Sequence, residues 1–218
     1  MRVVSRVAAI LFIVCIPLFL LTSNLRWAAN DLQFWEEGFE KYDVSTETGF
    51  SEKELTDISE GLIRYFNTGE IDDTIYVFSD DEITHLRDVR GLIQIDYIAQ
   101  WLTLGYIIIY IIAGFIFRKR LFARPLAVVL AAGSAAGIAA VVLTVIAAAI
   151  DFDWLFIVFH RIFFTNDLWI SSGYLPRIYT EGFFYDAAKM IALTTVIQSL
   201  LIGIPSGLFL LRRRIANQ

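Results

Sequence analysis

The sequence is poor in the residues that stabilise small secreted folds or build common metal sites. Its 218 residues include one cysteine, two histidines and four prolines. A single cysteine excludes an intramolecular disulfide framework. Cys15 lies in an apolar run and follows Val14 rather than a small residue, so we interpret it as an apolar filler. The zinc-protease motif H-E-x-x-H is absent.

Acidic residues are missing from most of the hydrophobic part of the chain. Of the 23 acids, 18 lie between Asp31 and Asp96. Hydrophobic residues make up 57% of the chain, above the roughly one-half that is usual for soluble proteins. They occur in blocks, and the basic clusters directly adjoin these blocks. The pattern indicates an integral membrane protein and gives no basic surface for nucleic acid.

Four apolar segments approach the length that a membrane-spanning helix needs, which is about 20 residues. They are residues 7–22, 98–117, 126–150 and 190–211. The sequence therefore predicts an all-α membrane protein with four transmembrane helices, folded as one membrane domain over residues 1–218. The first segment could instead be a signal peptide, but no A-x-A pattern follows it closely, which favours an uncleaved anchor. Gly133 and Gly137 form a G-x-x-x-G pattern, which we expect to pack within the helix bundle rather than to dimerise.

The basic residues next to these segments agree on one orientation. Positive residues mark the cytoplasmic ends of membrane spans. Nine of them flank the spans: Arg2, Arg6, Arg118, Lys119, Arg120, Arg124, Arg212, Arg213 and Arg214. This predicts that both termini are cytoplasmic and that residues 23–97 and 151–189 form an extracytoplasmic cap. The five tryptophans lie at or beyond the outer ends of the spans, as expected at a membrane interface.

The first cap segment is predicted to contain short helices. Residues 51–67 form an amphipathic pattern that starts with the capping box Ser51/Glu54. Thr74–Phe78 is rich in β-branched and aromatic residues, and could form one small strand pair. A second capping box, Ser79/Glu82, predicts a helix that runs toward the second span.

The second cap segment combines aromatic and charged residues in an unusual way. Residues 151–169 are too polar to span a membrane and too apolar to be fully solvated, so we expect an interfacial or re-entrant segment. Its polar members are costly there unless they are satisfied or functional: His160, Arg161, Asn166 and Asp167. Its aromatic members could line a groove for acyl chains or simply anchor the segment: Phe159, Phe163, Phe164 and Trp169.

Both histidines are predicted to lie at the same membrane face. Histidine is the side chain best suited to proton transfer near neutral pH. His85 and Asp88 are three residues apart and share a helix face. This pair could be a base with its orienting acid or a purely structural hydrogen-bonded pair, and spacing does not decide between them.

The sequence resembles the lipoprotein intramolecular transacylase (Lit) family of Gram-positive bacteria. The resemblance is carried by the stretches Glu82–Val89, with its acid-x-x-His-hydrophobic-x-Asp-Val pattern, and Phe159–Phe164, followed by Asp167, Trp169 and the pair Phe183–Phe184. Four spans and a large first outer segment also agree. The chain departs from the family at Asn166, where glycine is frequent, and over residues 171–180, where an expected acid is absent.

This resemblance implies a reaction, a substrate and site residues. The family moves the sn-2 acyl chain of a diacylglyceryl-cysteine lipoprotein to the α-amino group of that cysteine, without a cofactor. It implies that His85 and His160 are catalytic, at the extracytoplasmic face of a bacterial cell membrane. We expect Asp88 to orient His85 as a base with His160 as its partner, or the reverse. Asn166 or Arg161 is a candidate donor to the oxyanion. Expected partners are diacylated lipoproteins and membrane lipids.

Two other classes of function remain open from the sequence. A metal-dependent membrane hydrolase could use His85, His160, Asp88 and Asp167 as ligands. A non-enzymatic assembly protein could use the acidic stretch 31–96 to bind a partner. A small transporter is disfavoured, because the spans contain almost no ionisable residues to mark a pathway.

Overall fold

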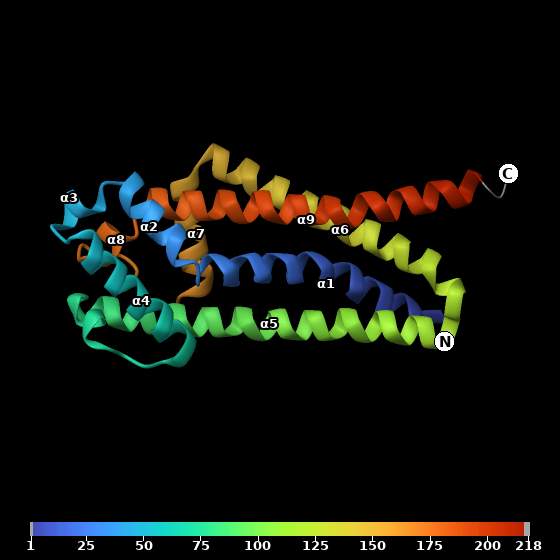
Figure 1. Cartoon of the computed structure of the whole chain (residues 1–218), viewed down its shortest axis with the longest axis horizontal. Coiled ribbons are helices and arrows are strands. Elements are labelled where there is room, and N and C mark those ends of the chain that lie inside the picture. Colours follow the sequence, from blue (N-terminus) through green and yellow to red (C-terminus); the bar gives the residue numbers. More distant parts are fainter. Residues whose placement is uncertain (1, 216–218) are drawn as a thin grey trace. The chain divides into compact units, whose positions relative to one another are not determined.

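The computed structural model describes residues 2–215, and describes side chains for residues 5–212. The side chains of Arg2, Arg213 and Arg214, which contributed to the predicted orientation, lie outside this part. Every regular element in the described chain is helical, which confirms the all-α prediction (Figure 1). The chain divides into two compact units. Unit 1 comprises residues 1–24, 97–146 and 191–218, and unit 2 comprises residues 25–96 and 147–190.

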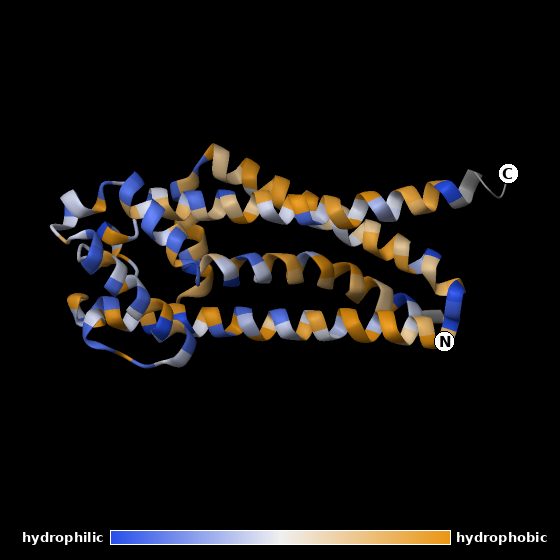
Figure 2. Cartoon of the chain, in the orientation of Figure 1, coloured by the Kyte–Doolittle hydropathy of each residue, from blue (hydrophilic) through white to orange (hydrophobic). Residues whose placement is uncertain are grey.

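Unit 1 is built from the apolar parts of four long helices. These are α1 (Arg2–Ala28), α5 (Asp80–Arg118), α6 (Ala123–Ile150) and α9 (Glu181–Ile215), with the 3-10 turn η2 (Lys119–Phe122) between α5 and α6. Three helical stretches are long and apolar enough to cross a membrane: Ser5–Ala28, Asp80–Ile150 and Glu181–Arg212 (Figure 2). The second stretch runs through α5, η2 and α6. The helices therefore have the length and composition of a multi-pass membrane protein.

Small residues let the helices of unit 1 approach closely. Phe12 and Ile16 of α1 are buried, at 0% and 4% exposure, and pack with Val129 of α6. A Cβ atom on Gly133 would lie 2.9 Å from Cβ of Ile16. The predicted role of the glycine pair in packing within the bundle is therefore confirmed for Gly133.

Unit 2 contains the short helices and the N-terminal ends of α5 and α9. Its own helices are α2 (Leu32–Lys41), α3 (Val44–Thr48), α4 (Glu52–Thr68), α7 (Phe152–Phe163) and α8 (Leu175–Ile178), with the 3-10 helix η1 (Asp73–Val77). The predicted amphipathic helix is α4, and both halves of the Ser51/Glu54 capping box are present. The apolar stripe of α4 contributes to a core in which Leu55, Leu62, Ile75 and Ile178 are at most 1% exposed.

The predicted strand pair is wrong. Thr74–Phe78 falls mostly in η1, and no strand occurs among residues 2–215. The carboxylate of Asp72 accepts a hydrogen bond from the Thr74 amide at 3.0 Å. Such a local side-chain acceptor turns the backbone and competes with pairing to another strand, whatever the β-propensity of the following residues.

The helices also extend well beyond the apolar segments that predicted them. Helix α5 begins at Asp80, far before the apolar run that starts at residue 98. Its start is fixed by the second predicted capping box, which is confirmed: Glu82 Oε2 accepts from the Ser79 amide at 2.9 Å, and Ser79 Oγ accepts from the Glu82 amide at 3.3 Å. This extension places residues 80–96 outside the apolar run.

Candidate active site

Helices α5 and α7 bring the two histidines together within unit 2. His85 lies in the second turn of α5, and His160 lies near the end of α7. The side chain of Asp151 caps α7 by accepting from the Trp154 amide at 2.8 Å. The two imidazole centroids are 6.1 Å apart, with 32° between the ring planes. Both histidines are buried, at 6% and 8% exposure.

Aromatic rings surround the imidazole of His160. The indole of Trp169 stacks on it with centroids 4.7 Å apart and ring planes 30° from parallel. Three phenylalanine rings also lie against it: Phe156 at 4.2 Å, Phe159 at 5.4 Å and Phe164 at 5.5 Å. Phe164 also meets His85 edge-on at 4.9 Å, so it contacts both imidazoles. This aromatic lining lowers the local dielectric around both rings.

A backbone hydrogen bond fixes the tautomer of His160. Its Nδ1 lies 2.8 Å from the carbonyl oxygen of Phe156, one turn earlier in α7. A carbonyl oxygen can only accept, so Nδ1 must carry the proton. In the neutral ring Nε2 then holds a free lone pair. By contrast, Nδ1 of His85 is buried and has no hydrogen-bond partner among the described residues.

Burial keeps both imidazoles neutral. It lowers the pKa of His85, as does the neighbouring His160, while the Asp88 carboxylate acts weakly in the opposite direction. Burial also lowers the pKa of His160, partly offset by the hydrogen bond to Phe156. Because the ordinary histidine pKa is about 6.5, both rings are uncharged at neutral pH.

Asp88 binds Asn166 rather than His85. Asn166 Nδ2 donates to Asp88 Oδ2 at 2.9 Å, and Asn166 Oδ1 accepts from the Leu168 amide at 3.1 Å. No hydrogen bond between His85 and Asp88 occurs in the described part of the chain. The predicted orienting pair is therefore not formed, and Asp88 instead holds the loop that follows α7.

Other predicted residues lie at the edge of the site. Arg161 and Asp167 are exposed, and neither side chain bonds a histidine in the region that the structure covers. Phe163 is 52% exposed and lies against Phe159, with centroids 4.8 Å apart and ring planes tilted by 45°. The structure thus brings together the two histidines, Phe159, Phe164 and Trp169, and leaves Arg161, Asp167 and Phe163 on the outside.

Glu82 has a larger structural role than the sequence suggested. It lies one helical turn before His85 and is 1% exposed. Its Oε1 accepts from Ser171 Oγ and from the Leu175 amide, both at 2.9 Å. Burial would raise the pKa of Glu82, but the hydrogen bonds from Ser79, Leu175 and Ser171 hold it below its ordinary value. A single carboxylate therefore joins the start of α5 to the loop that follows Trp169.

Two signals could have indicated this role. Glu82 is an acid one turn from a histidine, and Gly173 lies in the loop that follows Trp169. A Cβ atom on Gly173 would lie 2.3 Å from Glu82 Oε1, so a side chain there would displace the carboxylate from its hydrogen-bond partners. The sequence alone explained Glu82 completely as a helix cap, which concealed its second set of partners. Phe156 was missed for a similar reason, because it acts through its backbone carbonyl.

The described residues offer no ligand set for a metal ion. Within residues 5–212, no group of three or more His, Cys, Asp or Glu side chains is arranged to hold one. Asp88, proposed from sequence as a possible ligand, is engaged by Asn166. The metal-dependent alternative therefore gains no support from this arrangement.

Comparisons with known proteins agree on one family. The model of the family "Lipoprotein intramolecular transacylase Lit" matches residues 10–184. The chain is similar in structure to the membrane-integral lipoprotein intramolecular transacylase Lit of Bacillus cereus, with a TM-score of 0.82 at 16% identity, over 99% of this chain and 100% of that one. It is also similar to two histidine-substituted forms of that protein, each with a TM-score of 0.78 at 17% identity. These cover 98% and 96% of this chain, and 94% and 95% of theirs.

At 16–17% identity the solved structures show only that the fold is shared. Membership of the family rests on the family model, which matches residues 10–184. No curated protein matches the chain significantly. The family match extends over both histidine-bearing helices and most of the long apolar ones. The chain therefore belongs to the lipoprotein intramolecular transacylase family, and is a membrane-integral acyltransferase.

Proposed function

We propose that the chain moves the sn-2 acyl group of a diacylglyceryl-cysteine lipoprotein from its glycerol ester to the α-amino group of the same cysteine. The product is a lyso-form lipoprotein with an N-acyl chain. The observation that supports this chemistry best is the pair of buried, neutral imidazoles in unit 2. Nucleophile and ester belong to one molecule, so holding them in the reactive geometry supplies much of the rate.

The base is assigned to His160. The attacking amine must lose a proton as the new C–N bond forms, and Nε2 of His160 has its lone pair free because Nδ1 donates to Phe156. The C–O bond to glycerol then breaks, and the departing oxygen takes a proton from His85 as His85 receives one from protonated His160. One proton moves from nitrogen to oxygen overall. This relay leaves both rings neutral again, and their centroids are 6.1 Å apart.

The oxyanion of the tetrahedral intermediate needs a hydrogen-bond donor. Asn166 is suitable because its amide has two N–H groups, and Asp88 uses one of them. Arg161 is the second candidate, since it follows His160 directly and its side chain is exposed. Asp88 then acts by holding Asn166 in place.

The acyl chains are assigned to the outer face of α7. Phe159 and Phe163 are 42% and 52% exposed, and Ile162 between them is 70% exposed. This apolar face continues from the aromatic rings that contact His160. A lipid substrate could therefore keep its chains in an apolar environment while its ester reaches the imidazoles.

The proposed arrangement in the membrane has four spans and one domain over residues 1–218. The stretch Asp80–Ile150 contains two helices separated by η2, which supports two crossings there. Both termini are assigned to the cytoplasm, and residues 23–97 and 151–189 to an extracytoplasmic cap of a bacterial cell membrane. Diacylated lipoproteins are the proposed substrates, with membrane lipids as the surroundings.

Mass spectrometry of lipoprotein N-termini from expressing cells tests the reaction. We expect the lyso N-acyl form with the unchanged chain, and a loss of about 10²-fold or more with His85→Ala or His160→Ala. Arg87→Ala is a matched control, because Arg87 is an exposed neighbour of His85 on α5. Full activity in either histidine variant, at normal membrane abundance, would refute the assigned chemistry.

A further inference from the structure

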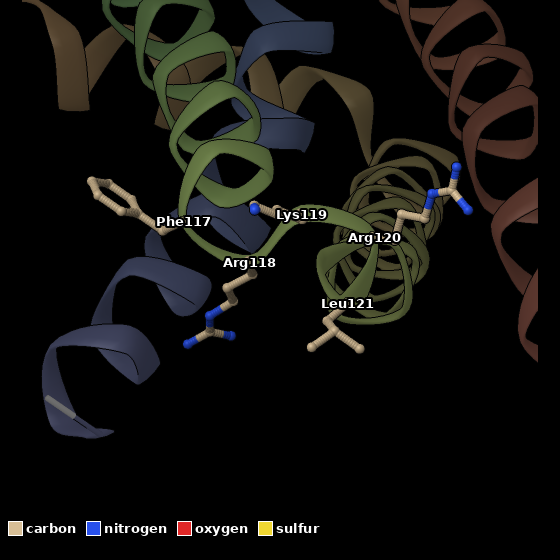
Figure 3. A pocket seen from close by; sticks show the side chains of 5 residues that line it. All are labelled: Phe117, Arg118, Lys119, Arg120 and Leu121. Carbon is tan, nitrogen blue, oxygen red and sulfur yellow. The ribbon is translucent and has the colours of Figure 1, made fainter.

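The turn between α5 and α6 carries a hollow that is remote in sequence from both histidines. Its lining is the consecutive stretch Phe117, Arg118, Lys119, Arg120 and Leu121 (Figure 3). Arg118 and Arg120 extend to opposite sides of the turn. Three cations and two apolar side chains thus share one short segment of unit 1.

These cations have no countercharge within their own unit. Unit 1 contains nine Lys and Arg residues and no Asp or Glu. Arg118 donates to Ser5 Oγ at 2.9 Å, but the Lys119 and Arg120 side chains bond no acceptor among the described residues of the chain. Lysine and arginine are strong phosphate ligands, arginine through its planar fork of N–H donors. The turn is therefore suited to an anion that the chain itself does not supply.

The turn is held in a fixed shape by packing. Phe122 is 3% exposed, and its ring lies 5.6 Å from that of Tyr110 and 5.3 Å from that of Phe115. A Cβ atom on Gly114 would lie 2.1 Å from the same ring, so glycine is needed there. Lys119 has φ of 48°, a left-handed conformation that reverses the chain direction. The cations therefore project from an ordered turn.

The apolar residues beside the cations indicate what kind of anion fits. Phe117 and Leu121 are 84% and 83% exposed, and Ile116 is 64% exposed. A soluble phosphate would leave these side chains in contact with water. An anion that carries acyl chains would cover them while its phosphate meets Lys119 and Arg120.

We propose that this turn binds the headgroup of an anionic phospholipid, with Lys119 and Arg120 on the phosphate and Phe117 and Leu121 against the acyl chains. The proposal is independent of the acyl-transfer reaction. It assigns a lipid-binding site to unit 1, whereas the proposed chemistry lies in unit 2. The lipid would supply the countercharge that unit 1 lacks.

Native mass spectrometry of the full chain in neutral detergent tests this binding. The chain is equilibrated with an equal mixture of phosphatidylglycerol and phosphatidylcholine, and the lipids retained are counted. We expect preferential retention of phosphatidylglycerol. In Lys119→Asn/Arg120→Gln its apparent affinity should fall roughly 25-fold, about fivefold per cation. Asparagine is chosen at position 119 because it tolerates left-handed backbone.

A charge-matched control separates this site from general electrostatics. Lys53→Gln/Lys189→Gln removes two exposed cations of unit 2 and should leave retention unchanged. Equal losses in both double variants, or no preference in the unchanged chain, would overturn the proposal.

A second variant tests whether the ligand is a lipid. Phe117→Ser/Leu121→Ser keeps every cation, and should also weaken phosphatidylglycerol retention if acyl chains are bound. Inorganic phosphate at the same concentration should not displace the lipid. Displacement by phosphate, with no effect of the serine variant, would show a site for free phosphate and overturn the lipid assignment. Circular dichroism confirms that each variant is helical before its binding is compared.

Discussion

The functional assignment of each histidine depends on single atoms that sequence cannot place. That both rings would lie at one membrane face followed from the positions of the apolar runs and the basic clusters. The hydrogen-bond partner of each ring could not be predicted from these features. Spacing on one helix suggested Asp88 for His85, but Asp88 is occupied by Asn166, which is 78 positions away in sequence. The bond that fixes the His160 tautomer goes to a backbone carbonyl, which any residue at position 156 could provide.

The lowered pKa values of the histidines predict where activity is lost in acid. A protonated imidazole cannot accept a proton, so the rate should fall as pH drops through the pKa of the base. Burial lowers the pKa of His160 and of His85, so the midpoint of this loss should lie below pH 6.5, the ordinary value. Initial rates of N-acyl product formation by the purified enzyme, measured across acidic and neutral pH, check this.

Removing the ring that covers His160 tests whether this histidine sets the acid midpoint of activity. Trp169→Ala removes the ring stacked on His160 and admits water, so the midpoint should move up toward the ordinary value. Ile170→Ala is the control, because Ile170 is 67% exposed and has no ring that could stack on a histidine. An acid midpoint at or above 6.5 in the unchanged enzyme would contradict a buried neutral base.

At the scale of elements, the apolar runs located the long helices but not their ends, which the capping residues marked. Hydrophobic runs mark the apolar parts of the long helices, but capping residues decide where the helices start, which is why α5 begins at Asp80. The capping boxes were recognisable because both partners are three residues apart. The contact of Glu82 with the loop of Ser171 and Leu175 joins segments about 90 positions apart, and no local pattern encodes it.

This contact predicts that Glu82→Gln impairs the site more than a lost helix cap would. The amide can accept on one atom only, so donors now bonded to the second carboxylate oxygen lose their partner, at about 1–3 kcal/mol for a buried group. The loop that follows Trp169 should loosen, and with it the stack on His160. For the purified variant we expect a lower midpoint of thermal unfolding. We also expect kcat to fall by a larger factor than KM rises.

Glu54→Gln is a matched control for this prediction. Glu54 forms the same kind of capping box with Ser51, but it is exposed and contacts no second loop in the described structure. Its substitution should change the thermal midpoint little and leave the kinetics unaltered. Equal effects of the two substitutions would show that Glu82 acts as a helix cap and no more. Glu82→Asp, which keeps the charge, should recover part of the activity if the carboxylate positions the loop.

At the scale of the whole molecule, charge is divided between the two units. All 23 acids lie in unit 2, together with nine cations, while unit 1 has nine cations and no acid. This division was readable from the sequence, because acids are excluded from apolar helices and cations cluster at their ends. The same division predicts an orientation in which the cations of unit 1 face the cytoplasm. A membrane potential of 100 mV, negative inside, favours each cation on the cytoplasmic side by about 2.3 kcal/mol.

This charge division predicts which surface faces the cytosol. In a Cys15→Ser parent, a cysteine introduced by Glu70→Cys should react with a membrane-impermeant maleimide in intact cells, since Glu70 is exposed in unit 2. A cysteine introduced by Arg124→Cys, at an exposed position in the first turn of α6, should react only after the membrane is permeabilised. The parent without cysteine controls for background labelling. The opposite pattern would place both histidines on the cytoplasmic side. It would thereby separate them from lipoproteins whose modified cysteine lies at the outer surface, and the proposed reaction could not occur there.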